Sequence, residues 1–250
     1  MPGAQSLMES TLVPEPRVGR VYRAQRTIRL ADVAADGRLR LDAMARYMQD
    51  VASDDVTDAG AEDELLTWVV RRTLIDVEQQ FGTDRSASLA TWASGAGSHW
   101  AARRTSITGD AGGHAEAESI WVILDRATSR PARLPALFDE LYGTSGLGRK
   151  VSAKLELPAA PAPETVGVRW PIRVSDIDTL GHANNAVYWA AVEDAVAALG
   201  WLPAVAEIEY HRPALPGSEP RLLISAAPAE AWAWLLNGGR PLASARMSAR

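Results

Sequence analysis

Two segments of the chain carry the same residue pattern, and this internal repeat constrains the fold more than any other feature. Residues 28–37 read Ile-Arg-Leu-Ala-Asp-Val-Ala-Ala-Asp-Gly and align without a gap on residues 172–181, Ile-Arg-Val-Ser-Asp-Ile-Asp-Thr-Leu-Gly, at an offset of 144 positions. A double glycine, at 112–113 and again at 238–239, separates two strand-like runs in each part of the chain, which suits hairpin turns with positive φ. We therefore predict two copies of one small fold.

Each copy is predicted to contain one long helix and several antiparallel strands. Helical spacing of apolar residues covers 42–58 in the first copy, and the matching segment, 185–199, is apolar almost all round, which predicts a buried helix. Strand-like runs are expected at 23–30, 67–78, 86–92, 100–108 and 115–124, and at 168–174, 204–210, 221–227, 231–236 and 241–247. A sheet wrapped around one helix is the hotdog fold, so the predicted class is α+β, a tandem (double) hotdog.

Composition places the boundary between the copies. Residues 143–165 are rich in Gly, Ser, Ala and Pro, which is typical of a linker. We therefore predict an N-terminal unit at 18–142 and a C-terminal unit at 166–250.

Charge and cysteine content exclude several classes of protein. The 26 basic and 31 acidic residues give a net charge of −5, which argues against nucleic-acid binding. Without cysteine there is no disulfide, thiolate metal site or cysteine nucleophile, and the four histidines have no metal-binding spacing. No apolar run is long enough to span a membrane, and residues 1–17 lack a signal-peptide pattern, so we expect a cytoplasmic protein.

The chemistry is predicted to lie in residues 176–188, just ahead of the second helix. This segment contains two Asp, one His and two Asn, namely Asp176, Asp178, His182, Asn184 and Asn185. Asn184 is suited to cap the helix, whose free backbone N–H groups can stabilise an oxyanion. A nearby carboxylate can act as nucleophile or as general base toward water. The alternative is an Asx-rich turn with a purely structural role.

The repeat separates loop architecture from candidate chemistry. At the offset of 144, Asp32 matches Asp176, whereas Ala34 stands in the place of Asp178 and Arg38 in the place of His182. A similar loop is therefore expected to form without these two side chains, which favours a functional role for both.

Two acids on the second helix are further candidates. Glu193 and Asp194 correspond to Gln49 and Asp50, so Glu193 is the more asymmetric of the pair. Adjacent helical residues point about 100° apart, so only one of the two is expected to face the loop. The alternative for either is a polar residue with no part in chemistry.

Residues 176–189 resemble the second-domain motif of acyl-acyl carrier protein (acyl-ACP) thioesterases, plant-type and bacterial. Residues 68–73, 91–97 and 119–135 are similar to the N-terminal domain of that family, and the likeness covers about 20–247. The resemblance implies a double hotdog whose first domain shapes the acyl pocket and whose second domain carries the catalytic loop. It also implies hydrolysis of fatty acyl thioesters, with no cofactor or metal.

Carried over by position, the family motif falls on Asp178, His182, Asn184 and Asn185. Two positions depart from it: Leu180 stands where the family commonly has Asn, and Pro213 stands near the place of a catalytic Glu of plant members. Either a leaner Asp/His site works or activity is reduced or redirected, and Glu193 or Asp194 is a candidate substitute for the lost Glu.

The predicted function is therefore hydrolysis of a fatty acyl thioester carried on ACP. An acyl-CoA thioesterase of the same fold and a non-catalytic acyl- or carrier-binding module are the alternatives. The arginines at 71–72, 103–104, 126, 130, 133 and 149, with Lys150, are candidates for docking an acidic carrier, or else solvated strand edges. The two copies form an internal pseudo-dimer, which leaves open whether two chains pair as a homodimer.

Overall fold

The computed structural model describes residues 12–146, 148–162, 165 and 167–250. Within them, ten strands form one antiparallel sheet in the order β1-β3-β4-β5-β2-β7-β10-β9-β8-β6. The strands are β1 (Tyr22–Thr27), β2 (Leu66–Gln79), β3 (Ser86–Ala96), β4 (Trp100–Gly109), β5 (His114–Asp125), β6 (Gly167–Arg169), β7 (Val205–Tyr210), β8 (Arg221–Ala227), β9 (Glu230–Asn237) and β10 (Arg240–Ser248). The helices are α1 (Leu41–Asp58), α2 (Ala136–Tyr142) and α3 (Asn185–Leu199).

The sheet is symmetric about its centre, where β2 pairs with β7. Reading outward, β5, β4, β3 and β1 on one side correspond to β10, β9, β8 and β6 on the other. The double glycines form the β4–β5 and β9–β10 turns, and Gly112, Gly238 and Gly239 all have positive φ. The chain is therefore a double hotdog, as the sequence predicts.

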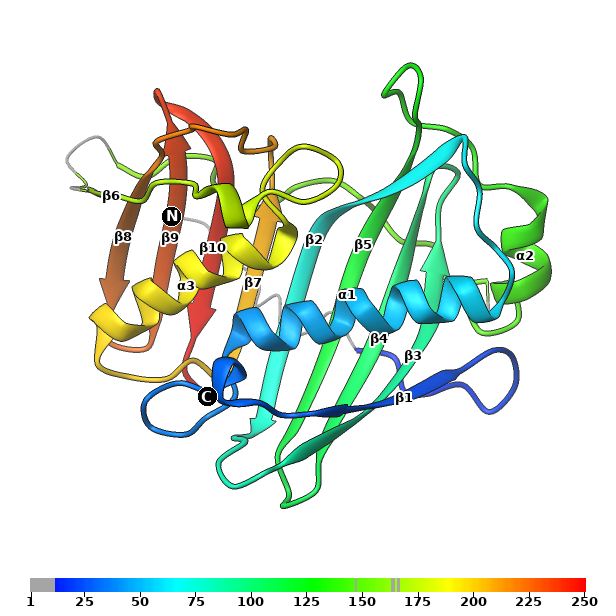
Figure 1. Cartoon of the computed structure of the whole chain (residues 1–250), viewed down its shortest axis with the longest axis horizontal. Helices are drawn as coiled ribbons and strands as arrows, with labels where there is room; N and C mark the ends of the chain where they lie inside the picture. The colour runs from blue at the N-terminus through cyan, green and yellow to red at the C-terminus, as the bar shows by residue number, and fades with distance from the viewer. Residues whose placement is uncertain (1–11, 147, 163–164, 166) are drawn as a thin grey trace.

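Both long helices lie on the same face of the sheet (Figure 1). Their buried side chains join those of the sheet in one core, which includes Met44, Met48, Trp189 and Val192. The expectation that α3 is buried all round is wrong for one side, because Asp194, Ala197 and Ala198 are exposed. An alanine-rich helix can leave such a side open because each exposed methyl group adds little apolar surface.

The sequence repeat is also a repeat of hydrogen bonds. The amide of Ala34 donates to the carbonyl of Arg38 at 2.8 Å, and that of Asp178 donates to the carbonyl of His182 at 2.9 Å. A 3-10 turn precedes each loop, at Leu30–Asp32 and at Val174–Asp176. The loop thus forms with either set of side chains, as the alignment predicts.

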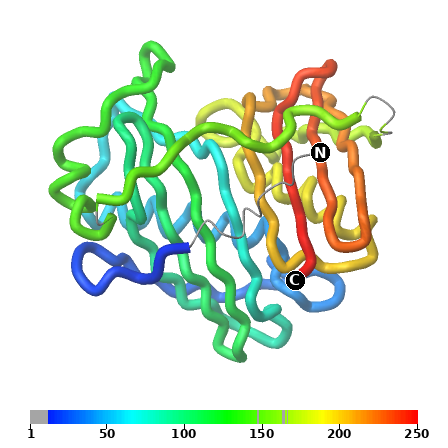
Figure 2. Tube along the Cα trace, turned by 180° about the vertical axis from the view of Figure 1, so that it is seen from behind, coloured from blue at the N-terminus to red at the C-terminus, as the bar shows by residue number. Residues whose placement is uncertain are grey.

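The segment between the two halves crosses the face of the sheet opposite the helices (Figure 2). Trp100 donates its indole N–H to the carbonyl of Val151 at 2.8 Å. Further along, the carboxylate of Glu209 on β7 accepts the amides of Glu156 at 2.7 Å and Leu157 at 2.9 Å. Residues 151–157 therefore form a strap that is hydrogen-bonded to the outer face of the sheet.

Glu207, on the same face of β7, gives the fold a pH-dependent term. It is almost fully buried against Arg72, and burial raises the pKa of its carboxyl to about 7. The folded chain therefore holds a proton that the unfolded chain releases between about pH 4.5 and pH 7, so stability from this group falls as pH rises through that window.

We expect Glu207→Gln to remove this dependence. Relative to the variant, the wild type should lose up to about 3 kcal/mol of unfolding free energy between pH 5 and pH 8. Its melting temperature should fall accordingly. Thermal denaturation of both proteins across this range measures the effect. A difference that stays constant with pH would contradict an elevated pKa at Glu207.

Candidate active site

The loop before α3 brings Asp178 and His182 together. Gly181, with φ of 79°, makes the tight turn between them, and its amide donates to the carbonyl of Asp178 at 3.0 Å. An Asp178 oxygen lies 3.8 Å from Nδ1 of His182, and both side chains are about one quarter exposed. One oxygen of Asp178 accepts the amide of Leu180 at 2.8 Å, which holds the carboxylate in the loop. The pair is thus ordered and open to solvent.

The two asparagines have different positions at the start of α3. Asn184 is the N-cap, and its side-chain oxygen accepts the amide of Ala186 at 3.0 Å. Asn185 is the first helical residue, and its backbone N–H has no hydrogen-bond acceptor in the described part of the chain. The positive end of the helix dipole adds to this free donor. The end of α3 is therefore suited to an oxyanion or carbonyl oxygen.

A cavity of about 570 Å³ begins at this loop and extends through the first half of the chain. Asp178, His182 and Asn185 line it beside Gln49 of α1. The rest of its wall comes from α1, α2 and strands β2 to β5, including Val56, Trp68, Trp121, Leu137, Phe138 and Tyr142. The largely apolar wall is suited to a long apolar ligand.

Three aromatic residues of the first half lie together where α2 forms part of the cavity wall. The ring of Phe138 lies 6.0 Å from that of Trp68 and 5.2 Å from that of Tyr142, measured between centroids. Arg103 stacks on Tyr142 and donates to the buried carboxylate of Asp55 at 2.7 Å. Phe138 and Tyr142 are not predicted from the sequence, because α2 has only seven residues and its periodicity is too short to recognise.

Glu193 lies away from Asp178 and His182 and contacts the first half instead. Its carboxylate accepts Nη1 and Nη2 of Arg38 at 3.0 and 2.6 Å, and the amide of Leu41 at 2.6 Å. Asp194 is exposed and accepts the indole N–H of Trp170 at 2.8 Å. The cavity wall includes neither acid.

The two positions that depart from the family motif are close to the loop. Leu180 is exposed and lines the cavity. Pro213 is exposed and precedes Ala214, whose carbonyl accepts the amide of Ala183 at 2.8 Å. The chain near position 213 therefore supports the loop through its backbone, without a carboxyl group.

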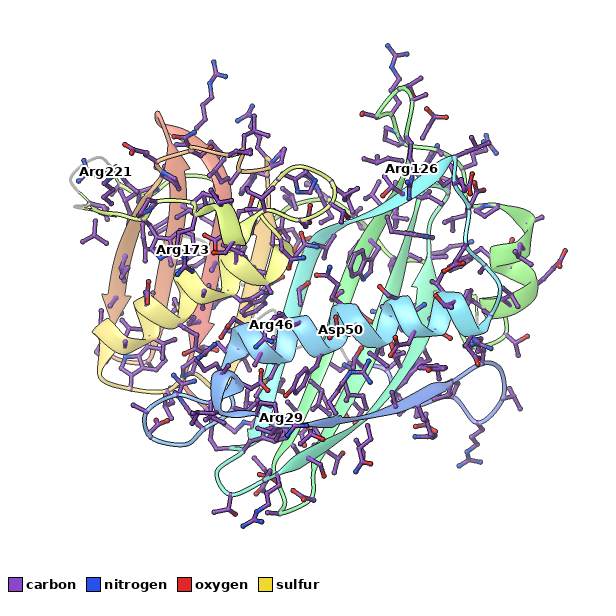
Figure 3. All side chains as sticks on the ribbon, in the orientation of Figure 1. Arg29, Arg46, Asp50, Arg126, Arg173 and Arg221 are labelled. Carbon is purple, nitrogen blue, oxygen red and sulfur yellow. The ribbon has the colours of Figure 1, made fainter. Side chains whose placement is uncertain are left out.

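The arginines of the sequence do not form one patch. Arg72, Arg103, Arg104 and Arg149 each pair with an acidic side chain of the same chain. The arginines at the β5–α2 connection are exposed, and Figure 3 shows Arg126 at the end of the strands that line the cavity. Acidic residues at 62–64 lie at the same end and also line the cavity.

Among the described residues, no group of three or more His, Cys, Asp or Glu side chains is placed to hold a metal ion. No helix within the described ranges is long and apolar enough to cross a membrane.

The fold defines a class, the double-hotdog proteins. The 12:0-ACP thioesterase of Umbellularia californica has a similar structure, with a TM-score of 0.76 and 21% identity over 92% of this chain and 97% of that one. An acyl-ACP thioesterase of Bacteroides thetaiotaomicron has a TM-score of 0.75 and 18% identity over 91% and 97% of the two chains. At these identities, the likeness shows a shared fold.

Comparison of the sequence with models of protein families identifies the family as well as the fold. The acyl-ACP thioesterase N-terminal domain matches residues 19–142 and the C-terminal domain matches residues 161–230. The chain therefore belongs to the acyl-ACP thioesterase family and is a thioester hydrolase. An uncharacterized protein of Mycobacterium tuberculosis is 29% identical over 210 residues, which cover 82% of this chain and 83% of that protein.

Proposed function

We propose that the chain hydrolyses fatty acyl thioesters at the loop before α3. The observation that carries the proposal is the backbone N–H of Asn185, which has no acceptor among the described residues. It lies with the Asp178–His182 pair at one end of an apolar cavity. The thioester carbonyl binds to this amide, and the acyl chain extends along α1 toward α2.

The reaction needs only groups of this chain and water. The Asp178 carboxylate takes a proton from a water molecule, and the hydroxide adds to the carbonyl carbon. The negative charge that develops on the carbonyl oxygen is stabilised by the amide of Asn185 and the helix dipole. When the carbon–sulfur bond breaks, the thiolate takes up a proton, and His182 orients the water or shuttles that proton. The products are a free fatty acid and a thiol.

The two halves divide the work in this proposal. Residues 18–142 shape the acyl pocket, residues 166–250 supply the catalytic loop and residues 143–165 link them. Asn184 positions the helix end as its cap. Glu193 takes no direct part, because its carboxylate is held by Arg38 and Leu41 of the first half.

We propose that the acyl group is delivered by acyl carrier protein, in cytoplasmic fatty acid biosynthesis. The exposed arginines at 126, 130 and 133 lie in the connection beside the cavity and offer positive charge to an acidic carrier. The acidic residues at 62–64 would face the same partner, so the carrier must approach from the arginine side.

Hydrolysis of C8 to C18 acyl chains, each offered on carrier protein and on coenzyme A, tests the proposal. We expect turnover with a higher kcat/KM for acyl-ACP than for acyl-CoA. Rising salt should lower kcat/KM for acyl-ACP much more than for acyl-CoA, because salt screens docking charges. Charge reversal at Arg130 or Arg133 should reproduce the salt effect for acyl-ACP alone. Better turnover of acyl-CoA at every salt concentration would favour the coenzyme A thioester. Binding without turnover would contradict the enzyme.

A further inference from the structure

The first half of the chain contains a closed copy of the proposed site. Leu41 begins α1 as Asn185 begins α3, and the loop residue Arg38 occupies the place of His182. In this copy a carboxylate oxygen of Glu193 lies 2.6 Å from the amide of Leu41, where an anion at a helix N-terminus is expected. The same carboxylate also binds Arg38. A side chain from the opposite half therefore fills the site.

The symmetry of the fold identifies the residue that occupies the corresponding place at the open site. The position equivalent to Glu193 on α1 is Gln49, at the offset of 144. Gln49 is half-buried and lines the same cavity as His182 and Asn185. Gln49 and Asn185 also line a second, smaller cavity together. No hydrogen bond from the Gln49 side chain is found within the described residues, so its amide is free to bind another molecule.

We propose that Gln49 is a catalytic residue contributed by the first half. Its Nε2 group donates a hydrogen bond to the thioester carbonyl oxygen, which the amide of Asn185 binds from the other side. This inference rests on the proposed function and adds a second donor to the site. Two donors aimed at one oxygen stabilise the charge that develops when water adds to the carbonyl carbon.

The contrast between Gln49 and Glu193 explains why one site is open. A carboxylate at position 49 would accept the amide of Asn185, as Glu193 accepts that of Leu41. It would also repel the developing oxyanion. A neutral carboxamide of the same length leaves the helix amide available and supplies an N–H donor of its own.

Kinetics of two variants with acyl-ACP or acyl-CoA test this role. We expect Gln49→Ala to lower kcat at least about tenfold with KM changed only a few-fold, because a donor that acts mainly in the transition state is lost. Gln49→Glu should lower kcat further. Gln80→Glu makes the same chemical change at an exposed position outside the cavity wall and should leave both constants unchanged.

The loss of kcat at a nearly unchanged KM is a readout that a merely structural role would not give, and the melting temperatures of Gln49→Ala and Gln49→Glu should stay close to that of the wild type. An active wild type whose turnover is unaffected in Gln49→Ala would overturn the role of Gln49 alone. A wild type inactive on every thioester would overturn the proposed hydrolysis and this role with it.

Discussion

Replacing Asp178 with Asn is expected to lower kcat/KM at least about a hundredfold, because an amide cannot take the proton from the attacking water. The fold should not change. The side-chain oxygen of Asn can still accept the amide of Leu180, and position 178 is partly exposed. Steady-state hydrolysis of an acyl thioester and the melting temperature of the variant measure the two effects separately.

Asp194→Asn is the matched control for this prediction. It makes the same chemical change on α3, at an exposed position outside the cavity wall, and Asn can still accept the indole N–H of Trp170. We expect its turnover to stay within about twofold of the wild type. Equal losses in both variants, or full activity in Asp178→Asn, would remove Asp178 from the mechanism.

Arg38→Ala is expected to destabilise the chain by about 3 kcal/mol, because it leaves the carboxylate of Glu193 buried without its cation. Both side chains of this pair are less than one fifth exposed. For a chain of this size, such a loss lowers the melting temperature by roughly 10 °C. Thermal denaturation near pH 7 measures the effect.

The double variant Arg38→Ala/Glu193→Ala separates this explanation from a general loss of packing. Removal of the stranded carboxylate should restore a large part of the lost stability, whereas two independent packing losses would add. Arg29→Ala replaces an arginine whose side chain is not part of any ion pair in the described structure, and it should cost less than about 1 kcal/mol. Additive losses in the double variant would contradict the coupling of Arg38 to Glu193.

The helices and strands are well predicted from the sequence, because the repeat shows the same pattern in both halves. The helix expected at 185–199 has these bounds, and that expected at 42–58 begins one residue earlier. The short strand β6 is the main difference: only Gly167–Arg169 pair with β8, whereas a run of seven residues was expected. The pairing ends at Trp170, whose backbone N–H donates to the carbonyl of Pro220 at 2.8 Å, because Pro220 has no N–H to return the bond.

The site is harder to predict, because each helix faces the loop of the opposite half. The asymmetry between Glu193 and Gln49 is visible in the alignment, and it marks both positions as special. It does not say which loop each side chain meets. Only the pairing of β2 with β7 and the packing of α1 on α3 place Glu193 against Arg38 and Gln49 beside His182.

The central pairing of β2 with β7 has a consequence for synthesis on the ribosome. The first half is complete in sequence well before β7 emerges, and until then residues Arg72–Asp76 of β2 have no partner on their open side. A bare strand edge readily pairs with another chain. The arrival of β7 closes this edge, and Glu209 then captures the strap behind it. A nascent chain that stalls within the connecting strap would therefore expose the edge at which two first halves can join.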